Sequence, residues 1–132
     1  MDLGYTFRTP ELLRLALTHS SASRTNNERL EFLGDSVLGM VVAEYLYRQA
    51  EYRTEGELAN TRAGVVANGF LYHAAIRLGI PQAIILGGSE EKSGGRNKHR
   101  LLANAVEAVI GAIYLDGGLE AARSFIITRV MR

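Results

Sequence analysis

Carboxylates at helical spacing are the residues of this sequence best suited to do chemistry. Glu28, Glu31 and Asp35 follow each other at steps of three and four, so on a helix they fall within an arc of about 60°. Asn104 and Glu107 are three residues apart and share a face of a second predicted helix. Carboxylate and amide oxygens suit hard divalent cations, so the pattern predicts one site for Mg²⁺ or Mn²⁺ built from two helices.

The segments that carry these side chains are otherwise apolar. Residues 37–47 contain one strongly polar side chain, Glu44, and residues 101–115 contain only the Asn and Glu just named. Helices that are apolar nearly all round lie inside a bundle. Gly39 continues the first polar face, and Gly111 continues the second where a close neighbour can pack. The sequence therefore predicts two core helices that meet along their polar faces.

Simpler explanations exist for single acids. Glu107 can form a buried ion pair with Arg29 or Arg62, since an unpaired buried carboxylate costs several kcal/mol. An acid in the first helical turn offsets the helix dipole, which accounts for Glu28 but not for Asp35, two turns in. With no Cys and no His on either polar face, zinc fits poorly, and the Glu-x-x-His pairs of di-iron bundles are missing.

Cap and turn signals divide the chain into helices. Pro10 after Thr9 opens the first helix, Asn26 or Asn27 caps the second, and Thr54 begins a capping box. A break near residues 68–69, a stop at Gly79 and Pro81, a polar loop over 87–99 and the pair 117–118 mark the other boundaries. We expect helices over about 10–19, 28–49, 55–67, 69–78, 100–115 and 119–131. No segment alternates like a strand, so we predict one all-α domain.

Composition narrows the class of protein. A chain of 132 residues that is 47% hydrophobic can build one core, and the absence of Cys excludes disulfide scaffolds and thiol catalysis. The net charge of +1 is too balanced for a protein that binds polyanions by charge alone. The start has no export signal, and no unbroken apolar run approaches the roughly 20 residues of a spanning helix. We therefore expect a soluble, cytoplasmic protein without membrane contact.

Two segments resemble the motifs of a known family. Residues 27–38 (NERLEFLGDSVL) resemble the signature of the ribonuclease III family, and residues 102–118, LANAVEA through GAIYLDGG, resemble its second motif. The order of 18–20 (THS), 55–58 (EGEL) and 92–95 (KSGG) also fits, so the resemblance covers essentially the whole chain.

The resemblance implies the activity and the partners. We expect residues 1–132 to form an all-helical endonuclease domain that cleaves double-stranded RNA as a symmetric homodimer. The expected cofactor is Mg²⁺, with Mn²⁺ as a substitute and no organic cofactor. The expected products carry 5′-phosphates and short 3′ overhangs.

The resemblance also implies roles for individual residues. Three carboxylates match the family's metal ligands: Glu31, Asp35 and Glu107. Among these, Asp35 and Glu107 match the central catalytic pair. Glu28 and Glu55 match acids that line the cleft near the cleaved strand, although either is equally explained as a helix-start acid. Phe32 matches an aromatic knob that enters a socket on the partner subunit, where the alternative is an ordinary core Phe.

The sequence departs from the family pattern at Asn104, where the family usually has Asp. The amide oxygen can still bind a cation or its water, so Asn104 stays in the expected metal and catalytic set. The site loses one formal negative charge, which predicts weaker metal binding or slower turnover. The alternative function is a weakened or inert domain that serves as an RNA-binding or ribosome-associated scaffold. A plain helical dimerisation domain leaves the buried acids unexplained.

Basic residues offer contacts for RNA phosphates. The candidates near the 87–99 loop and near the N-terminus are Lys92, Arg96, Lys98, Arg100, Arg8, Arg14 and Arg24. For any one of them, a solvated surface position is the simpler explanation. Recognition of A-form RNA rests on groove shape and 2′-hydroxyls rather than on base reading. The double-stranded-RNA-binding domain usual in the family is not found in these residues.

Overall fold

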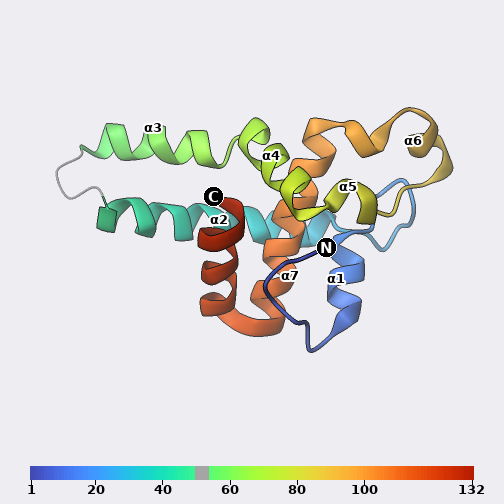
Figure 1. Ribbon diagram of the computed structural model, residues 1–132, viewed down its shortest axis with the longest axis horizontal. Helices are drawn as coiled ribbons and strands as arrows, with labels where there is room; N and C mark the ends of the chain where they lie inside the picture. The colour runs from blue at the N-terminus through green and yellow to red at the C-terminus, as the bar shows by residue number, and fades with distance from the viewer. Residues whose placement is uncertain (50–53) are drawn as a thin grey trace.

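Two long helices cross steeply at the centre of the computed structural model, which describes residues 1–49 and 54–132 (Figure 1). They are α2, Glu28–Gln49, and α7, His99–Phe125, and they share the most extensive contact in the described part of the chain. The other helices surround this crossing: α1 Pro10–Ala16, α3 Glu55–Val65, α4 Asn68–Leu78, α5 Ile80–Ala83, α6 Gly88–Lys92, the 3₁₀ turn η1 Gly95–Asn97 and the π-helical turn η2 Ile126–Val130. Among the described residues, β pairing is limited to one isolated bridge between Thr18 and Ile85.

The start of α2 lies where two asparagines satisfy its first amides. The Asn26 side chain accepts a hydrogen bond from the Glu28 N–H at 3.0 Å, and the Asn27 carbonyl accepts one from Glu31 at 2.8 Å. The buried Asn27 amide group donates to the carbonyl of Ala16, which ties the loop to the end of α1. The predicted bounds of α2 are confirmed.

Glycines bring α2 and α7 into backbone contact. A Cβ added at Gly34 would lie 1.7 Å from the carbonyl oxygen of Glu107, and one added at Gly111 would lie 2.4 Å from the carbonyl oxygen of Leu30. No side chain larger than hydrogen fits at either place without moving a helix backbone. The expectation that Gly111 marks a close approach is confirmed, whereas Gly39 faces open space.

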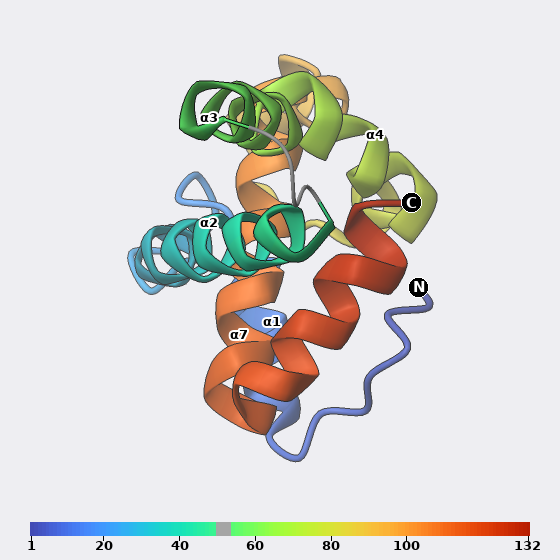
Figure 2. The same ribbon diagram turned by 90° about the vertical axis from the view of Figure 1, so that its left-hand side faces the viewer.

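α7 fills the core and then changes direction. Every residue of 101–113 except Asn104 is buried. The segment His99–Val130 is long and apolar enough to cross a membrane by length and composition, but 67% of its most apolar window is buried inside the protein, as expected of a core helix. Gly118 has φ 88° and ψ −179°, and after it the chain turns back beside the first part of α7 (Figure 2). The predicted break between 115 and 119 is confirmed as a kink.

The expected end of the first helix is wrong, whereas its expected start at Pro10, with Thr9 at the N-cap, is confirmed. α1 ends at Ala16 rather than near His19, because Leu17 and His19 instead form backbone hydrogen bonds with Ile85, at 2.8 and 2.9 Å. Thr9 lies at the N-cap but its side chain caps nothing. Its amide donates to the carboxylate of Asp116 on α7 at 3.0 Å, so a distant residue anchors the start of α1.

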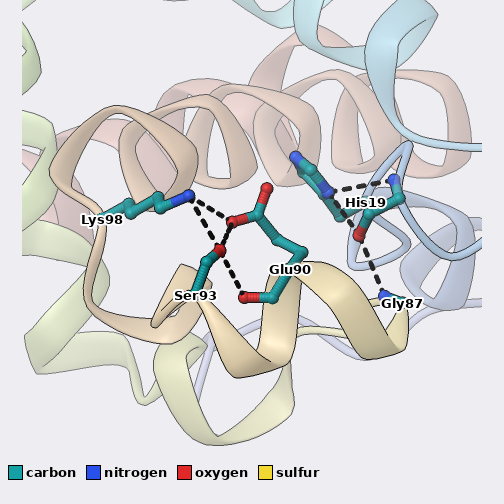
Figure 3. Close-up of polar contacts among 6 residues, drawn as sticks. His19, Gly87, Glu90, Ser93 and Lys98 are labelled. Atoms are coloured by element: carbon teal, nitrogen blue, oxygen red, sulfur yellow. Dashed lines mark hydrogen bonds and ion pairs between the residues drawn. The ribbon is translucent and has the colours of Figure 1, made fainter.

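The predicted polar loop over 87–99 is folded into two short helical turns, α6 and η1. The Glu90 carboxylate accepts hydrogen bonds from Lys98 and Ser93, which links the two turns (Figure 3). At the start of α6, the Gly87 amide donates to the hydroxyl of Ser21 at 2.9 Å, and that hydroxyl contacts Nδ1 of His19 at 2.8 Å. Polar side chains therefore order a segment that lacks an apolar helical pattern.

Replacement of Gly34 by alanine tests the crossing. We expect Gly34→Ala to destabilise the protein by at least about 3 kcal/mol, because overpacking against a backbone atom forces the two helices apart. Gly39→Ala on the same helix is the matched control. It meets nothing within 4 Å and should stabilise the helix by roughly 0.5–1 kcal/mol. Urea unfolding followed by circular dichroism measures both; equal midpoints for the two variants would contradict the packing described.

Candidate active site

A cleft of about 410 Å³ lies where the polar faces of α2 and α7 meet. Its lining residues are Glu28, Glu31, Phe32, Asp35, Asn68, Arg100, Asn104 and Glu107. The structure thus brings together the four residues expected to hold a metal, with Glu28 and Phe32 beside them. Glu55 is not part of this cleft.

The helix crossing explains this convergence. Gly34 lies between Glu31 and Asp35 on α2, and its backbone rests against the backbone of Glu107 on α7. The glycine contact therefore places the turn that carries two α2 carboxylates beside the turn that carries Glu107. Asn104 lies one turn earlier on the same face of α7. The packing of backbones, rather than any ion pair, gathers the acids.

Glu107 is a buried carboxyl among other carboxyls. Its side chain belongs to a residue only 8% exposed. Burial raises the pKa of Glu107 most, and together with a hydrogen bond with Asp35 and the charges of Asp35 and Glu31 it brings the pKa to about 8. No ion pair in the described residues joins Glu107 to Arg29 or Arg62, so the structural salt bridge considered above is not formed.

Glu31 has a milder version of the same environment. Partial burial raises its pKa, and the charges of Glu28 and Asp35 act in the same direction. The guanidinium of Arg100 opposes them and lowers the pKa of Glu31. Arg100 is thus close enough to the acidic cluster to act on its charge.

The donor set fits a hard divalent cation by its chemistry. The candidate ligands, Glu31, Asp35, Asn104 and Glu107, offer only oxygen atoms, which Mg²⁺ and Mn²⁺ prefer. A cation between Asp35 and Glu107 would replace the proton that these carboxyls share, because it favours their ionised forms. In the described part of the chain, however, no three His, Asp or Glu side chains are already arranged to hold a metal ion. The fit therefore rests on the Asp35–Glu107 pair.

Phe32 and Glu55 occupy different surfaces. Phe32 is 79% exposed, so its alternative interpretation as a core residue is wrong. Glu55 is the first residue of α3 and lines a separate groove of about 500 Å³ between α2 and α3, whose apolar lining includes Met40, Tyr47 and Leu58.

The sequence did not single out three residues that shape the cleft. Gly34 sits between two candidate ligands in sequence, but it lies outside the arc that Glu28, Glu31 and Asp35 share, so their spacing does not mark it. Asn68 enters the cleft as the first residue of α4, which only the tertiary arrangement reveals. Arg100 is expected from the sequence only as a possible phosphate contact near the 87–99 loop. In the structure it lines the cleft, one turn before Asn104 on the same face of α7.

Comparisons with known proteins agree with this arrangement. The family described as "Ribonuclease-III-like" matches residues 9–132. "Ribonuclease 3" of Nitrosococcus oceani is 52% identical over 124 residues, covering 94% of this chain and 53% of that protein. "Ribonuclease 3" of Coxiella burnetii (strain CbuK_Q154) is 48% identical over 125 residues, covering 95% of this chain and 54% of that protein.

A solved structure matches the fold closely. The nuclease domain of ribonuclease III from Campylobacter jejuni superimposes with a TM-score of 0.95 at 41% identity, covering 97% of this chain and 90% of that chain. Its description mentions structural flexibility in a region involved in dimer formation. The chain belongs to the ribonuclease III family and has the all-helical fold of its nuclease domain. It spans about half the length of the curated relatives it matches.

The pKa of Glu107 predicts how stability depends on pH in a chelating buffer. The folded protein keeps a proton on Glu107 that the unfolded chain releases above about pH 4.5, so stability falls as pH rises from about 4.5 to about 8. The slope is up to about 1.4 kcal/mol per pH unit. Glu107→Gln should remove this dependence and be more stable than the parent at pH 8. Thermal or urea unfolding across that range measures it.

The matched control is Glu11→Gln, which neutralises an exposed carboxylate on α1. It should follow the pH dependence of the parent. Parent and Glu107→Gln curves of equal slope between pH 5 and 8 would rule out a proton held on Glu107.

Proposed function

We propose that this chain is a metal-dependent endonuclease domain that cleaves double-stranded RNA. We take residues 1–132 as one such domain, with Mg²⁺ as the cofactor and Mn²⁺ as a substitute. The observation that carries the proposal is the meeting of Asp35 and Glu107 in one cleft, beside Glu31 and Asn104, in a chain of the ribonuclease III family. Expected products carry 5′-phosphates and short 3′ overhangs.

Each of the polar cleft residues has its own role in the proposed hydrolysis. A bound divalent cation supplies an activated water and shields the phosphate charge. Asp35 and Glu107 would hold the cation, and the burial of Glu107 would keep bulk water from competing for its carboxylate. Glu31 and Asn104 would supply further oxygen ligands. Glu28, at the exposed start of α2, would act near the cleaved strand.

A weaker alternative follows from Asn104. With an amide in place of the family's usual Asp, the cleft offers one fewer negative charge to a cation, and no complete three-acid metal cluster is found among the described residues. An inert domain that serves as an RNA-binding or ribosome-associated scaffold would share this fold. The buried Glu107 argues against it, because an uncompensated buried carboxyl costs stability without serving a scaffold.

We propose a symmetric homodimer as the working form. Phe32 is exposed at the edge of the acidic cleft, and the groove beside Glu55 is apolar, with Met40 and Tyr47 exposed on its rim. Insertion of Phe32 of one copy into this groove of the other would bury all three side chains. Because Phe32 lines the cleft and Glu55 lines the groove, this docking would bring Glu55 close to the partner's cleft.

The dimer accounts for the choice of substrate. Two clefts related by a two-fold axis face the two strands of a duplex, which share such symmetry. Recognition then depends on A-form shape and 2′-hydroxyls. A cytoplasmic location agrees with a sequence free of Cys and with the burial of its most apolar helix.

Cleavage of a long RNA duplex tests the proposed function. We expect cleavage with Mg²⁺ or Mn²⁺ and none with chelator, and we expect Glu107→Gln to lower the rate by at least about 100-fold because a ligand charge is lost. Asn104→Asp should lower the Mg²⁺ concentration needed for half-maximal cleavage, because it restores a carboxylate. Gel analysis of end-labelled duplex measures both effects.

The outcomes separate the two candidate functions. No cleavage by the parent or by Asn104→Asp, at low salt and with either metal, would leave the scaffold as the function. Unchanged metal titration in Asn104→Asp would exclude Asn104 from the metal site. Glu11→Gln, distant from the cleft, serves as the charge-matched control.

The dimer interface has its own prediction. Phe32→Ala should raise the dimer dissociation constant by at least roughly 30-fold, because a central aromatic anchor contributes about 2 kcal/mol or more. Ile76→Ala, which removes another exposed apolar side chain, should leave it unchanged. Sedimentation equilibrium measures both. A parent that is monomeric at micromolar concentration would refute the dimer.

A further inference from the structure

The basic residues near the segment 87–99 differ in the hydrogen bonds and ion pairs that their side chains form. The Arg96 guanidinium is bound by the Glu91 carboxylate and by the carbonyls of Pro81 and Ile84. Lys98 pairs with Glu90. These two side chains are engaged in maintaining α6 and η1, so they are poor candidates for RNA contacts. For these two residues, whose expected alternatives are a phosphate contact or a solvated surface position, the structure shows ion pairs within the fold.

Arg100 is placed differently. It is exposed, it lines the acidic cleft, and no hydrogen bond or ion pair among the described residues holds its guanidinium. On α7 it precedes Asn104 by four residues and Glu107 by seven, so it shares their face. The cleft therefore combines four carboxyls with one guanidinium that acts on the charge of Glu31 but forms no hydrogen bond or ion pair within the described residues.

Contacts between α4 and α7 position the first turn of α7, which carries Arg100. The rings of Tyr72 and His99 stack with centroids 3.7 Å apart and an interplanar angle of 17°, which joins α4 to the first residue of α7. Asn68 lies one turn before Tyr72 and also lines the cleft. The first turns of α4 and α7 thus deliver an amide and a guanidinium to the same side of the cleft.

We propose that Arg100 binds a backbone phosphate of the RNA strand that enters the cleft, with Asn68 as a neighbouring hydrogen-bond donor. This inference rests on the proposed function, since it assumes that the duplex lies across this cleft. A guanidinium matches a phosphate in shape and charge and gives up little where no other partner holds it. Among the described residues that line the cleft, Arg100 is the basic side chain beside the carboxylates and can attract a strand's phosphate.

The salt dependence of binding tests the proposal. Each lost phosphate contact lowers the slope of log K against log salt by about 0.7–0.9. Arg100→Ala should weaken binding of a short labelled RNA duplex and reduce the slope by that amount, whereas Arg100→Lys should retain the slope. Fluorescence anisotropy in Ca²⁺ over a series of KCl concentrations, without cleavage, gives both values. Circular dichroism verifies folding, and Arg100→Gln replaces any variant that does not fold.

Arg48→Ala is the matched control. Arg48 is exposed and lies about 20 Å further along α2 than Asp35 at 1.5 Å per residue, so its loss should leave the slope unchanged. A parent that binds no duplex would overturn both this proposal and the proposed function. A parent that binds, with Arg100→Ala and Arg48→Ala giving equal slopes, would overturn the proposal for Arg100 alone. Tighter Mn²⁺ binding by Arg100→Ala with an unchanged slope would show that Arg100 only balances the charge of the carboxylates.

Discussion

The backbone contact between α2 and α7 is the constraint on which the rest of this structure depends. Gly34 on α2 and Gly111 on α7 both lack a side chain, and a Cβ at either position would collide with the backbone of the other helix. The contact lets Leu30 and the apolar residues of α7 pack in one core. It also fixes which polar residues meet, because the carboxylates lie one residue or one turn from the glycines. Fold and site therefore have one physical origin.

The same contact creates the electrostatic character of the site. Bringing the helices together buries Glu107 beside Asp35, and the resulting desolvation and hydrogen bond hold its pKa near 8. The protein alone must keep a proton there, at a cost in stability at neutral pH. The proposed cation would compensate this charge and remove that cost. Asn104 limits that cost, because an amide adds no further negative charge to the cleft.

Local signals predicted most of the helices, and distant contacts explain the errors. The bounds of α2, the capping box of α3 and the break before α4 follow from neighbouring residues, and the structure confirms them. The end of α1 depends on Ile85, and its start depends on Asp116, neither of which is near in sequence. Short turns such as α6 depend on side-chain pairs like Glu90 and Lys98, which no helical periodicity reveals.

The site was predictable to the extent that it follows helical periodicity. Spacing placed Glu31, Asp35, Asn104 and Glu107 on two faces, and their polarity in apolar helices implied that the faces meet. Which glycine forms the contact was not predictable from spacing, since Gly39 and Gly34 both lie near the α2 acids. Glu55 lies in another groove, and the proposed role for it requires a second copy, whose placement one chain's sequence does not specify.

The way ion pairs occupy basic residues bears on the proposed RNA binding more than the net charge of +1 does. Among the described residues, ion pairs hold five basic side chains: Arg48, Arg96, Lys98, Arg123 and Arg129. These contribute to the total charge but offer little attraction to a polyanion. Because the affinity for a polyanion grows with the number of phosphate contacts, one copy with few such contacts would bind RNA weakly. A duplex that touches both copies of a dimer would double those contacts, and the second contact then forms at a high effective concentration. In the proposed dimer, affinity for a duplex would therefore depend on both copies, whereas each cleft would carry its own chemistry.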